Sequence, residues 1–382
     1  MLSSSALPKA SCNNLGTYLP LLLACLHISD AWIHPSIKIS TTPLNAIRIP
    51  FLERKERSRE QLSEGIAGFY DRSSALWEDV WGEHMHHGYY PTHMPQPKTL
   101  SDHRAAQSDM IDKVLDWSAA PSGTFWDGSQ APKEWAPTSV VDVGCGIGGS
   151  TRHIAKRFSG SLKRGVGITL SPKQQARATL LSDQAGLLDK AADGGTAAAA
   201  AAAAVASGPL SFQVANALAM PFESGSFDLV WSLESGEHMP DKPTFVGELC
   251  RVCAPGGRVI VVTWCHRDLK EGEDGLTPKE ERLLDRINRC YYLPKWCSVA
   301  DYKSLMADQG LTGIRSADWT REISAFWPAV IKSSLKPKSI VGLLRSGLTT
   351  MRGAVAMFLM VIGYRRGLIV FGLITATKPP KP

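Results

Sequence analysis

The residues with the most pronounced chemical character form the glycine-rich run 142–149, Asp-Val-Gly-Cys-Gly-Ile-Gly-Gly. Apolar residues precede it, so a buried strand is expected to end where the glycines begin. Glycines let the backbone turn sharply and approach a ligand closely, and a helix that starts there directs its N–H groups at that ligand. The run therefore predicts a cofactor site at the end of a strand.

The glycine spacing by itself fits two kinds of cofactor. Gly144, Gly146 and Gly149 match the G-x-G-x-x-G pattern of dinucleotide-binding proteins. Those proteins place an acidic residue near the end of the second strand, where it binds a ribose hydroxyl. Here that strand ends in 167–170, Gly-Ile-Thr-Leu, without an acid, and an acid stands instead at Asp142, before the first glycine. This arrangement argues against a dinucleotide.

A second group of chemically capable residues follows the strand expected at 227–232. It contains Glu234, Glu237 and His238. In open α/β sheets, ligands bind beyond the carboxyl ends of the strands, so these side chains are expected near the cofactor. A histidine can accept a proton near neutral pH, and a carboxylate can orient it or act in its place. The other interpretation is that Glu237 and His238 only cap a helix.

The elements that must position these residues alternate between strand and helix. Apolar runs predict strands at 139–143, 165–169, 210–214, 227–232 and 258–263, with a late strand-like run at 368–377. Helices are expected at 150–158 and 244–253, and another begins at Pro172 with Ser171 as its N-cap. Such alternation predicts an α/β fold with a parallel sheet.

Further segments give the chain a family resemblance. Residues 227–231, Phe-Asp-Leu-Val-Trp, stand at the spacing of a fourth strand, and 254–257, Ala-Pro-Gly-Gly, precede the fifth. With the glycine run, they resemble the class I methyltransferases. The resemblance implies S-adenosyl-L-methionine as cofactor and a Rossmann-like, doubly wound, mostly parallel seven-stranded sheet with helices on both faces. It also implies an N-terminal flap and C-terminal lid elements.

The resemblance assigns cofactor contacts by position. Around the methionine part it implies Asp142, Gly144, Gly146 and Gly148. The second strand and the turn after it resemble the cyclopropane-synthase and tocopherol branch, which implies ribose contacts from Thr169, Leu170 and Gln174. Asn216 and Ala217 stand where an Asp-Ala pair usually faces the adenine, and Ser232 completes the set. An asparagine can still accept a hydrogen bond from the adenine amine through its carbonyl oxygen.

Two longer strings indicate the substrate class. From about residue 65 onward, the chain resembles the plastid tocopherol C-methyltransferases, most specifically in 234–242, ESGEHMPDK, and in 263–268, TWCHRD. This resemblance implies methylation of a phenolic ring carbon, converting γ- to α-tocopherol and δ- to β-tocopherol. The substrate contacts it implies are Tyr89, Tyr90, Trp264, His266 and Trp327.

The chemistry that this activity requires is removal of the phenol proton, which makes the ring a better nucleophile. His238 is the expected base, with Glu237 or Glu234 orienting it or acting instead, and Tyr89 or Tyr90 packing against the cofactor sulfur. No metal is expected, because the histidines at 84, 86 and 87 lack partners at clear ligand spacing.

Other activities remain open at this point. They are methylation of a prenyl or phytyl benzoquinol precursor, alkaloid N-methylation, sterol C-methylation, and cofactor or lipid binding without catalysis. The substrate in the preferred interpretation is a lipophilic phenol. No nucleic acid and no obligate protein partner is inferred.

The ends of the 382-residue chain suggest where it works. Residues 1–31 are typical of a signal peptide, and residues 32–60 of a plastid transit peptide and linker; together they resemble the bipartite leaders of complex secondary plastids. Residues 61–382 are the expected catalytic domain, with a cofactor core at about 100–270, a low-complexity insertion at 191–208 and a substrate and lid region at about 271–382. The apolar segment 331–374 contains interspersed Lys and Arg, which favours peripheral contact with a plastid membrane.

Overall fold

A computed structural model describes residues 61–62, 64–68, 71, 78, 82–92, 99–119, 135–189, 208–327 and 348–380. Several sequence predictions lie outside these residues. They are the leader, the transit segment, residues 191–207 of the predicted insertion, and 331–347 of the predicted membrane-contact segment.

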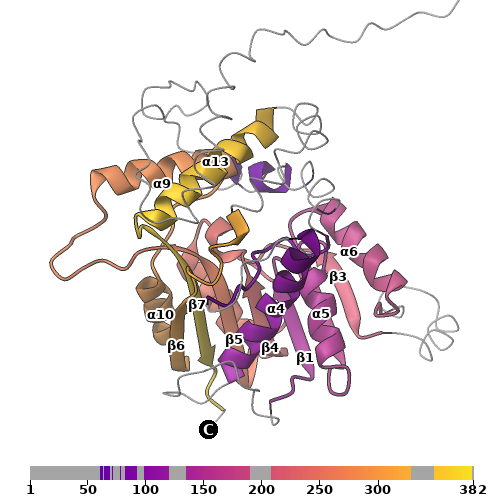
Figure 1. Ribbon diagram of the computed structural model, residues 1–382. Helices are drawn as coiled ribbons and strands as arrows, with labels where there is room; N and C mark the ends of the chain where they lie inside the picture. The colour runs from indigo at the N-terminus through magenta and orange to yellow at the C-terminus, as the bar shows by residue number, and fades with distance from the viewer. Residues whose placement is uncertain are drawn as a thin grey trace, which may run out of the picture.

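The described chain forms one seven-stranded sheet in the order β3-β2-β1-β4-β5-β7-β6 (Figure 1). The strands are β1 (Ser139–Val143), β2 (Arg164–Thr169), β3 (Leu210–Val214), β4 (Phe227–Leu233), β5 (Cys253–His266), β6 (Thr312–Asp318) and β7 (Ile369–Thr377). The first five pair in parallel, whereas β7 is antiparallel to both of its neighbours. The predicted Rossmann-like, mostly parallel seven-stranded sheet is confirmed.

Alternating side chains of the strands supply two separate cores. On β1, Val140 packs in a core with the helices α4 (Leu100–Ala119) and α5 (Gly149–Arg157), while Val141 packs with α8 (Lys242–Val252) and α10 (Val299–Asp308). Because successive side chains of a strand point to opposite faces, one apolar run such as 139–143 serves both cores. The first helix pair lies on the near face of the sheet in Figure 1.

Two helices lie above the carboxyl edge of the parallel strands. The helix α9 (Pro278–Tyr291) packs against α13 (Leu348–Arg365), and both are at the top of Figure 1. α9 starts with a complete capping box, in which Thr277 accepts from the backbone of Glu280 and the Glu280 side chain accepts from the backbone of Thr277. Leu283, Leu284 and Ile287 form its buried face. Both helices fall within the region 271–382, which the sequence predicts to hold the substrate and lid elements.

The structure differs from the sequence predictions at three places. β5 begins at Cys253, so the expected turn 254–257 lies within the strand's bounds as an irregularity. The edge strand β6 was not predicted from the sequence, because its residues are mostly exposed and show little apolar alternation. The helix α13 was not predicted from the sequence, and a turn at 366–367 separates it from β7, which confirms the predicted strand-like run 368–377.

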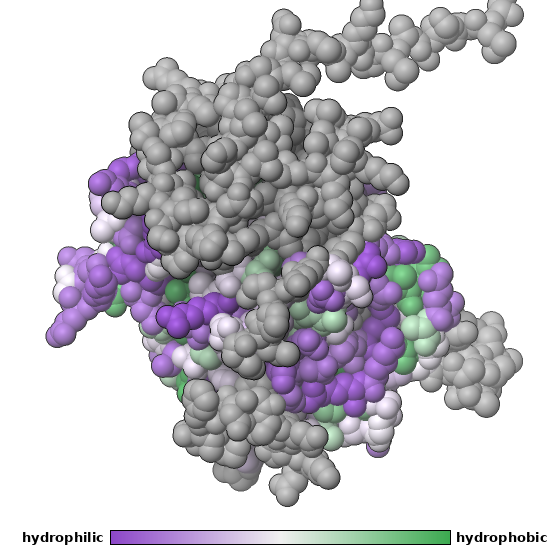
Figure 2. Space-filling view, viewed as in Figure 1, coloured by the Kyte–Doolittle hydropathy of each residue, from purple (hydrophilic) through white to green (hydrophobic). Residues whose placement is uncertain are grey.

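In the described ranges, none of the helices has both the length and the apolar character needed to cross a bilayer. On the face shown in Figure 2, the described surface over α4 and α5 is mainly hydrophilic.

Candidate active site

The glycine-rich turn between β1 and α5 adopts backbone conformations that favour glycine. Gly144, Gly146 and Gly148 have φ angles of 87°, 55° and 80°, in the left-handed region. A Cβ atom on Gly144 would lie 2.3 Å from the Cβ of Ser235, and one on Gly149 would lie 2.3 Å from the carbonyl oxygen of Glu83. Glycine is needed here both for the turn and for the close approach of neighbouring segments.

A pocket with an empty volume of about 940 Å³ opens beside this turn. Ten of the predicted site residues line it: Asp142, Gly144, Gly146, Thr169, Leu170, Gln174, Asn216, Ala217, Glu234 and His238. Gly148, Ser232 and Glu237 do not line the pocket, and neither do the predicted substrate residues. The pocket also takes in Glu83, His84, Met85 and His86 from the N-terminal segment, which the sequence did not suggest as cofactor contacts.

Polar side chains inside the pocket are held by local hydrogen bonds. Ser171 accepts from the backbone of Gln174 as the N-cap of α6 (Pro172–Gln184), and the Thr169 hydroxyl donates to the Gln174 side chain at 2.8 Å. Asp142 is buried and accepts from the Thr151 hydroxyl at 2.6 Å, and burial raises its pKa to about 7. The carboxyl, the amide and the bare glycine backbone suit the polar groups of S-adenosylmethionine.

A buried arginine ties the N-terminal segment to the glycine turn. The guanidinium of Arg152 on α5 donates to Glu83 at 2.6 and 3.1 Å and to the carbonyl of Ile147 at 2.8 Å. Arg152 is almost fully buried, whereas the Glu83 side chain is about half exposed. The contact holds residues 83–86 over the pocket, so Arg152 helps to shape the site without lining it.

The predicted acid–base residues occupy different surroundings. His238 ends the 3-10 turn η3 (Gly236–His238), and burial, with the nearby charge of Lys242, lowers its pKa to about 3. Glu237 is buried and accepts from the Thr263 hydroxyl at 2.7 Å; burial, with the charge of Glu234, raises its pKa to about 8. Neither surrounding favours the charged form of the side chain.

Glu234 has a partner that the sequence did not suggest. Its two carboxylate oxygens contact His87, one accepting from the backbone N–H at 2.6 Å and the other lying 2.7 Å from Nδ1. Although burial opposes ionisation, these contacts hold the pKa of Glu234 below its usual value. His87 and Glu234 are 147 residues apart, so no local pattern could reveal the pair.

The predicted substrate residues divide between two places. Trp264 and Trp327 belong to an aromatic cluster around His87, with ring centroids 6.0 and 5.1 Å from its imidazole. Tyr90 is buried, and its hydroxyl pairs with Nδ1 of His103 at 2.9 Å. Tyr89 packs edge-on against Trp319. The two tyrosines therefore pack beside α4 and β6, away from the pocket lining.

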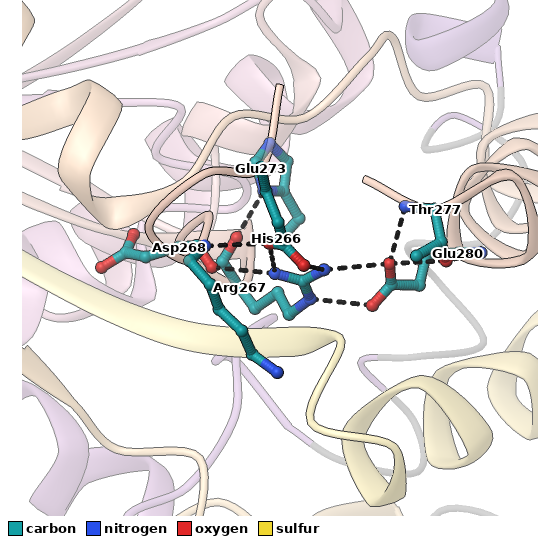
Figure 3. A network of polar contacts seen from close by, with 7 residues as sticks. His266, Arg267, Asp268, Glu273, Thr277 and Glu280 are labelled. Carbon is teal, nitrogen blue, oxygen red and sulfur yellow. Dashed lines mark hydrogen bonds and ion pairs between the residues drawn. The ribbon is translucent and has the colours of Figure 1, made fainter. Parts of the chain in front are cut away.

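His266 is the last residue of β5, directly before the loop that leads to α9. Its Nδ1 is 2.8 Å from the carbonyl oxygen of Arg267. Figure 3 shows the Arg267 guanidinium between Glu273 and Glu280, with hydrogen bonds of 2.6 to 3.1 Å. These contacts lower the pKa of Glu280 to about 2. The network fixes the start of α9 relative to the end of β5, and so positions the lid helix over the sheet edge.

The described residues do not bring metal-binding side chains together. Within those ranges, there is no group of three or more His, Cys, Asp or Glu side chains that could hold a metal ion. His84 and His86 have ring centroids 5.2 Å apart, and burial lowers the pKa of His86 to about 4.

Comparison with known proteins first gives the class. Residues 141–261 match the model of a methyltransferase domain. The geranyl diphosphate C-methyltransferase of Streptomyces coelicolor A3(2) has a similar fold, with a TM-score of 0.58, 20% identity, and coverage of 85% of this chain and all of the other. Fold, glycine turn and pocket define an S-adenosylmethionine-dependent methyltransferase of class I.

Closer relatives give the family. The probable chloroplastic tocopherol O-methyltransferase of Oryza sativa subsp. japonica is 50% identical over 83% of this chain and 79% of its own length. The chloroplastic tocopherol O-methyltransferase of Arabidopsis thaliana is 47% identical, over 84% of both chains. The chain belongs to the tocopherol methyltransferase family. The names of both relatives place them in the chloroplast, which supports a plastid location for this chain.

Proposed function

We propose that the protein methylates a ring carbon of tocopherols, converting γ- to α-tocopherol and δ- to β-tocopherol. The observation that carries this proposal is the position of Glu234. It lines the cofactor pocket, and its carboxylate is bonded to a histidine inside an aromatic cluster. Acid–base groups thus stand between the cofactor site and a cluster of aromatic side chains that could contact a phenolic ring.

The chemistry divides between the cofactor and the chain. When bound, S-adenosylmethionine supplies an electrophilic methyl group. Asp142, Gln174 and the glycine turn would hold it in the pocket, with Thr169, Leu170, Asn216, Ala217 and Ser232 completing the proposed set. The side chains beyond β4 would hold the phenol and accept its proton. Holding reactants in line can by itself contribute about 7–11 kcal/mol.

The sequence-based choice of base is His238, with Glu237 or Glu234 orienting it or acting instead. His238 lines the pocket, which supports this choice, whereas its lowered pKa makes it a weak proton acceptor near neutral pH. The test is His238→Gln. Loss of 10²-fold or more in kcat, with cofactor affinity unchanged, is expected if His238 is the base. Near-normal turnover would remove it from that role.

The site of methylation on the phenol needs its own test, since the names of the two relatives specify O-methylation. A phenolate can react at oxygen or at a ring carbon. C-methylation keeps the phenolic hydroxyl and removes an aromatic C–H, whereas O-methylation removes the hydroxyl. Proton NMR of the product separates the two outcomes, and an aryl methyl ether would refute the proposed ring position.

The deciding experiment incubates the full chain with labelled S-adenosylmethionine and a panel of acceptors. The panel contains γ-, δ- and β-tocopherol, a phytyl benzoquinol, a sterol and an alkaloid amine. Transfer to γ- and δ-tocopherol alone is the expected result. Transfer only to the benzoquinol would move the reaction one stage earlier, and transfer only to the amine or the sterol would refute the phenol assignment.

We also propose that the protein works at the surface of a plastid membrane, in a complex secondary plastid. A prenyl chain dissolves in lipid, so the substrate must be collected from a membrane. The exposed Arg365 ends the helix α13 and the exposed Arg366 follows it in the turn; basic side chains at a protein surface favour contact with anionic lipid. Flotation with anionic and neutral liposomes tests this; absence of the protein from both liposome fractions would refute it.

A further inference from the structure

The pair of His87 and Glu234 has the geometry of a catalytic dyad. Glu234 binds both the backbone N–H and Nδ1 of His87, at 2.6 and 2.7 Å, and both side chains are nearly buried. A carboxylate at Nδ1 accepts its proton, which leaves Nε2 as the nitrogen with a free lone pair. The pairing therefore fixes both the orientation of the imidazole and its tautomer.

The free nitrogen of His87 is buried in an aromatic cluster. In the described part of the chain, Nε2 has no hydrogen-bond partner. The ring is surrounded by Phe326, Trp327, Phe371 and Trp264, with centroids 4.3 to 6.0 Å away. Buried polar atoms nearly always have partners, so a bare acceptor in this position indicates a ligand group that is to be bound there.

Other polar atoms of the same cluster are bare as well. The indole nitrogens of Trp264, Trp296 and Trp327 are buried without partners among the described residues. Trp264 links the three, with ring centroids 5.9 Å from Trp296 and 6.3 Å from Trp327. These N–H groups can donate only. Aromatic walls with bare donors and one bare acceptor suit an aromatic ring that bears a hydroxyl and further oxygen atoms.

The backbone on both sides of the dyad is fixed. Glu234 has a φ of 52°, which is unusual for a non-glycine residue, and its N–H donates to the carbonyl of Val262 at 2.7 Å. On the other side, the buried Gln107 amide donates to the carbonyls of His84 and His86 at 2.8 and 2.9 Å. A left-handed residue held in this way at a pocket is typical of functional sites.

We propose that His87 is the general base of the methyl transfer, with Glu234 as its positioning residue. This inference rests on the proposed phenolic substrate. Nε2 takes the hydroxyl proton as the ring carbon bonds to the methyl group and the methyl–sulfur bond breaks. The resulting dienone loses the proton of that carbon to water, and the oxygen regains a proton from His87. The products are the methylated phenol, S-adenosylhomocysteine and one proton.

The groups around the dyad are consistent with this role. Besides His87, four titratable groups interact electrostatically with Glu234. They are His86 next to His87, Glu237 and His238 from η3, and Tyr364 from α13. The pKa shifts of these four groups favour their neutral forms, whereas the lowered pKa of Glu234 favours its carboxylate. A carboxylate at this position can stabilise the protonated imidazole of His87.

The experiment compares His87→Gln and Glu234→Gln with the wild-type chain and with the control His153→Gln, which loses a partly exposed pairing to Asp112 and an edge-on ring contact with His84. His87→Gln is expected to lower kcat for γ-tocopherol by 10²- to 10⁴-fold, while S-adenosylhomocysteine affinity stays within threefold. Its kcat should then rise about tenfold per pH unit over the range below the pKa of the phenol, because the substrate must ionise without a base. Glu234→Gln should lower kcat without raising KM in proportion.

Several results would overturn the inference. One is a His87→Gln variant with kcat within threefold of wild type and the same pH profile. Another, which does not depend on the variants folding, is ¹⁵N NMR of the wild-type chain labelled at histidine: a hydrogen on Nε2 of His87 near neutral pH would exclude it as acceptor. If the wild-type chain methylates no phenol, the proposed function itself fails, which is a separate outcome.

Discussion

Replacing Gly144 by alanine tests whether this position requires glycine for two reasons, its left-handed backbone conformation and its close contact with Ser235. Gly144 has a φ of 87°, and an L-residue in the left-handed region costs roughly 1–2 kcal/mol. The new Cβ would also lie 2.3 Å from the Cβ of Ser235, whose hydroxyl donates to the carbonyl of Val143 at 2.6 Å. Overpacking of this kind costs roughly 1–3 kcal/mol. The expected total is about 2–5 kcal/mol.

Gly310→Ala is the matched control, because Gly310 has a φ of 74° and open space where its Cβ would lie. This control should lose only the conformational part, about 1–2 kcal/mol. Urea unfolding gives both free energies of unfolding, and calorimetry with S-adenosylhomocysteine gives the affinities. Gly144→Ala should be less stable than the control and should bind the cofactor product at least tenfold more weakly. Equal stability and equal affinity in the two variants would refute the packing argument.

Two further predictions follow from buried charges. The pKa of Glu237 in the folded protein, about 8, lies above its ordinary value of 4.5, so between these pH values the folded protein keeps a proton that the unfolded chain releases. The free energy of unfolding should therefore fall as pH rises from about 4.5 to 8, by at most about 1.4 kcal/mol per pH unit. Glu237→Gln should remove that part of the slope, as measured by urea unfolding at pH 5 and pH 8; an unchanged slope would show that Glu237 ionises normally. Arg152→Met removes the contacts to Glu83 and to the carbonyl of Ile147, and should weaken S-adenosylhomocysteine binding roughly tenfold, about 1.4 kcal/mol, by calorimetry. Unchanged affinity would mean that the segment over the pocket does not depend on this arginine.

Much of the fold follows from local patterns in the sequence. The apolar run 139–143 and the glycines after it predict a strand and a turn, because strand burial and left-handed turns each require particular residue types. Ser171 and Pro172 predict the start of α6, and the structure has this cap. The edge strand β6 lacks such a pattern, since an exposed edge needs few apolar side chains. The late apolar run 368–377 predicts β7, whereas the apolar residues of α13 carry no clear helical periodicity.

The candidate site divides in the same way. The sequence by itself determined that a glycine turn follows β1 and that Glu234 and His238 follow β4, since both are consequences of neighbouring residues and strand order. Only the tertiary structure decided which side chains pair. It joined Glu234 to His87 across 147 residues, and it directed Glu237 toward Thr263. Such pairings depend on how the N-terminal segment packs over the sheet edge, and because that packing is set by many distant contacts at once, no local pattern specifies it.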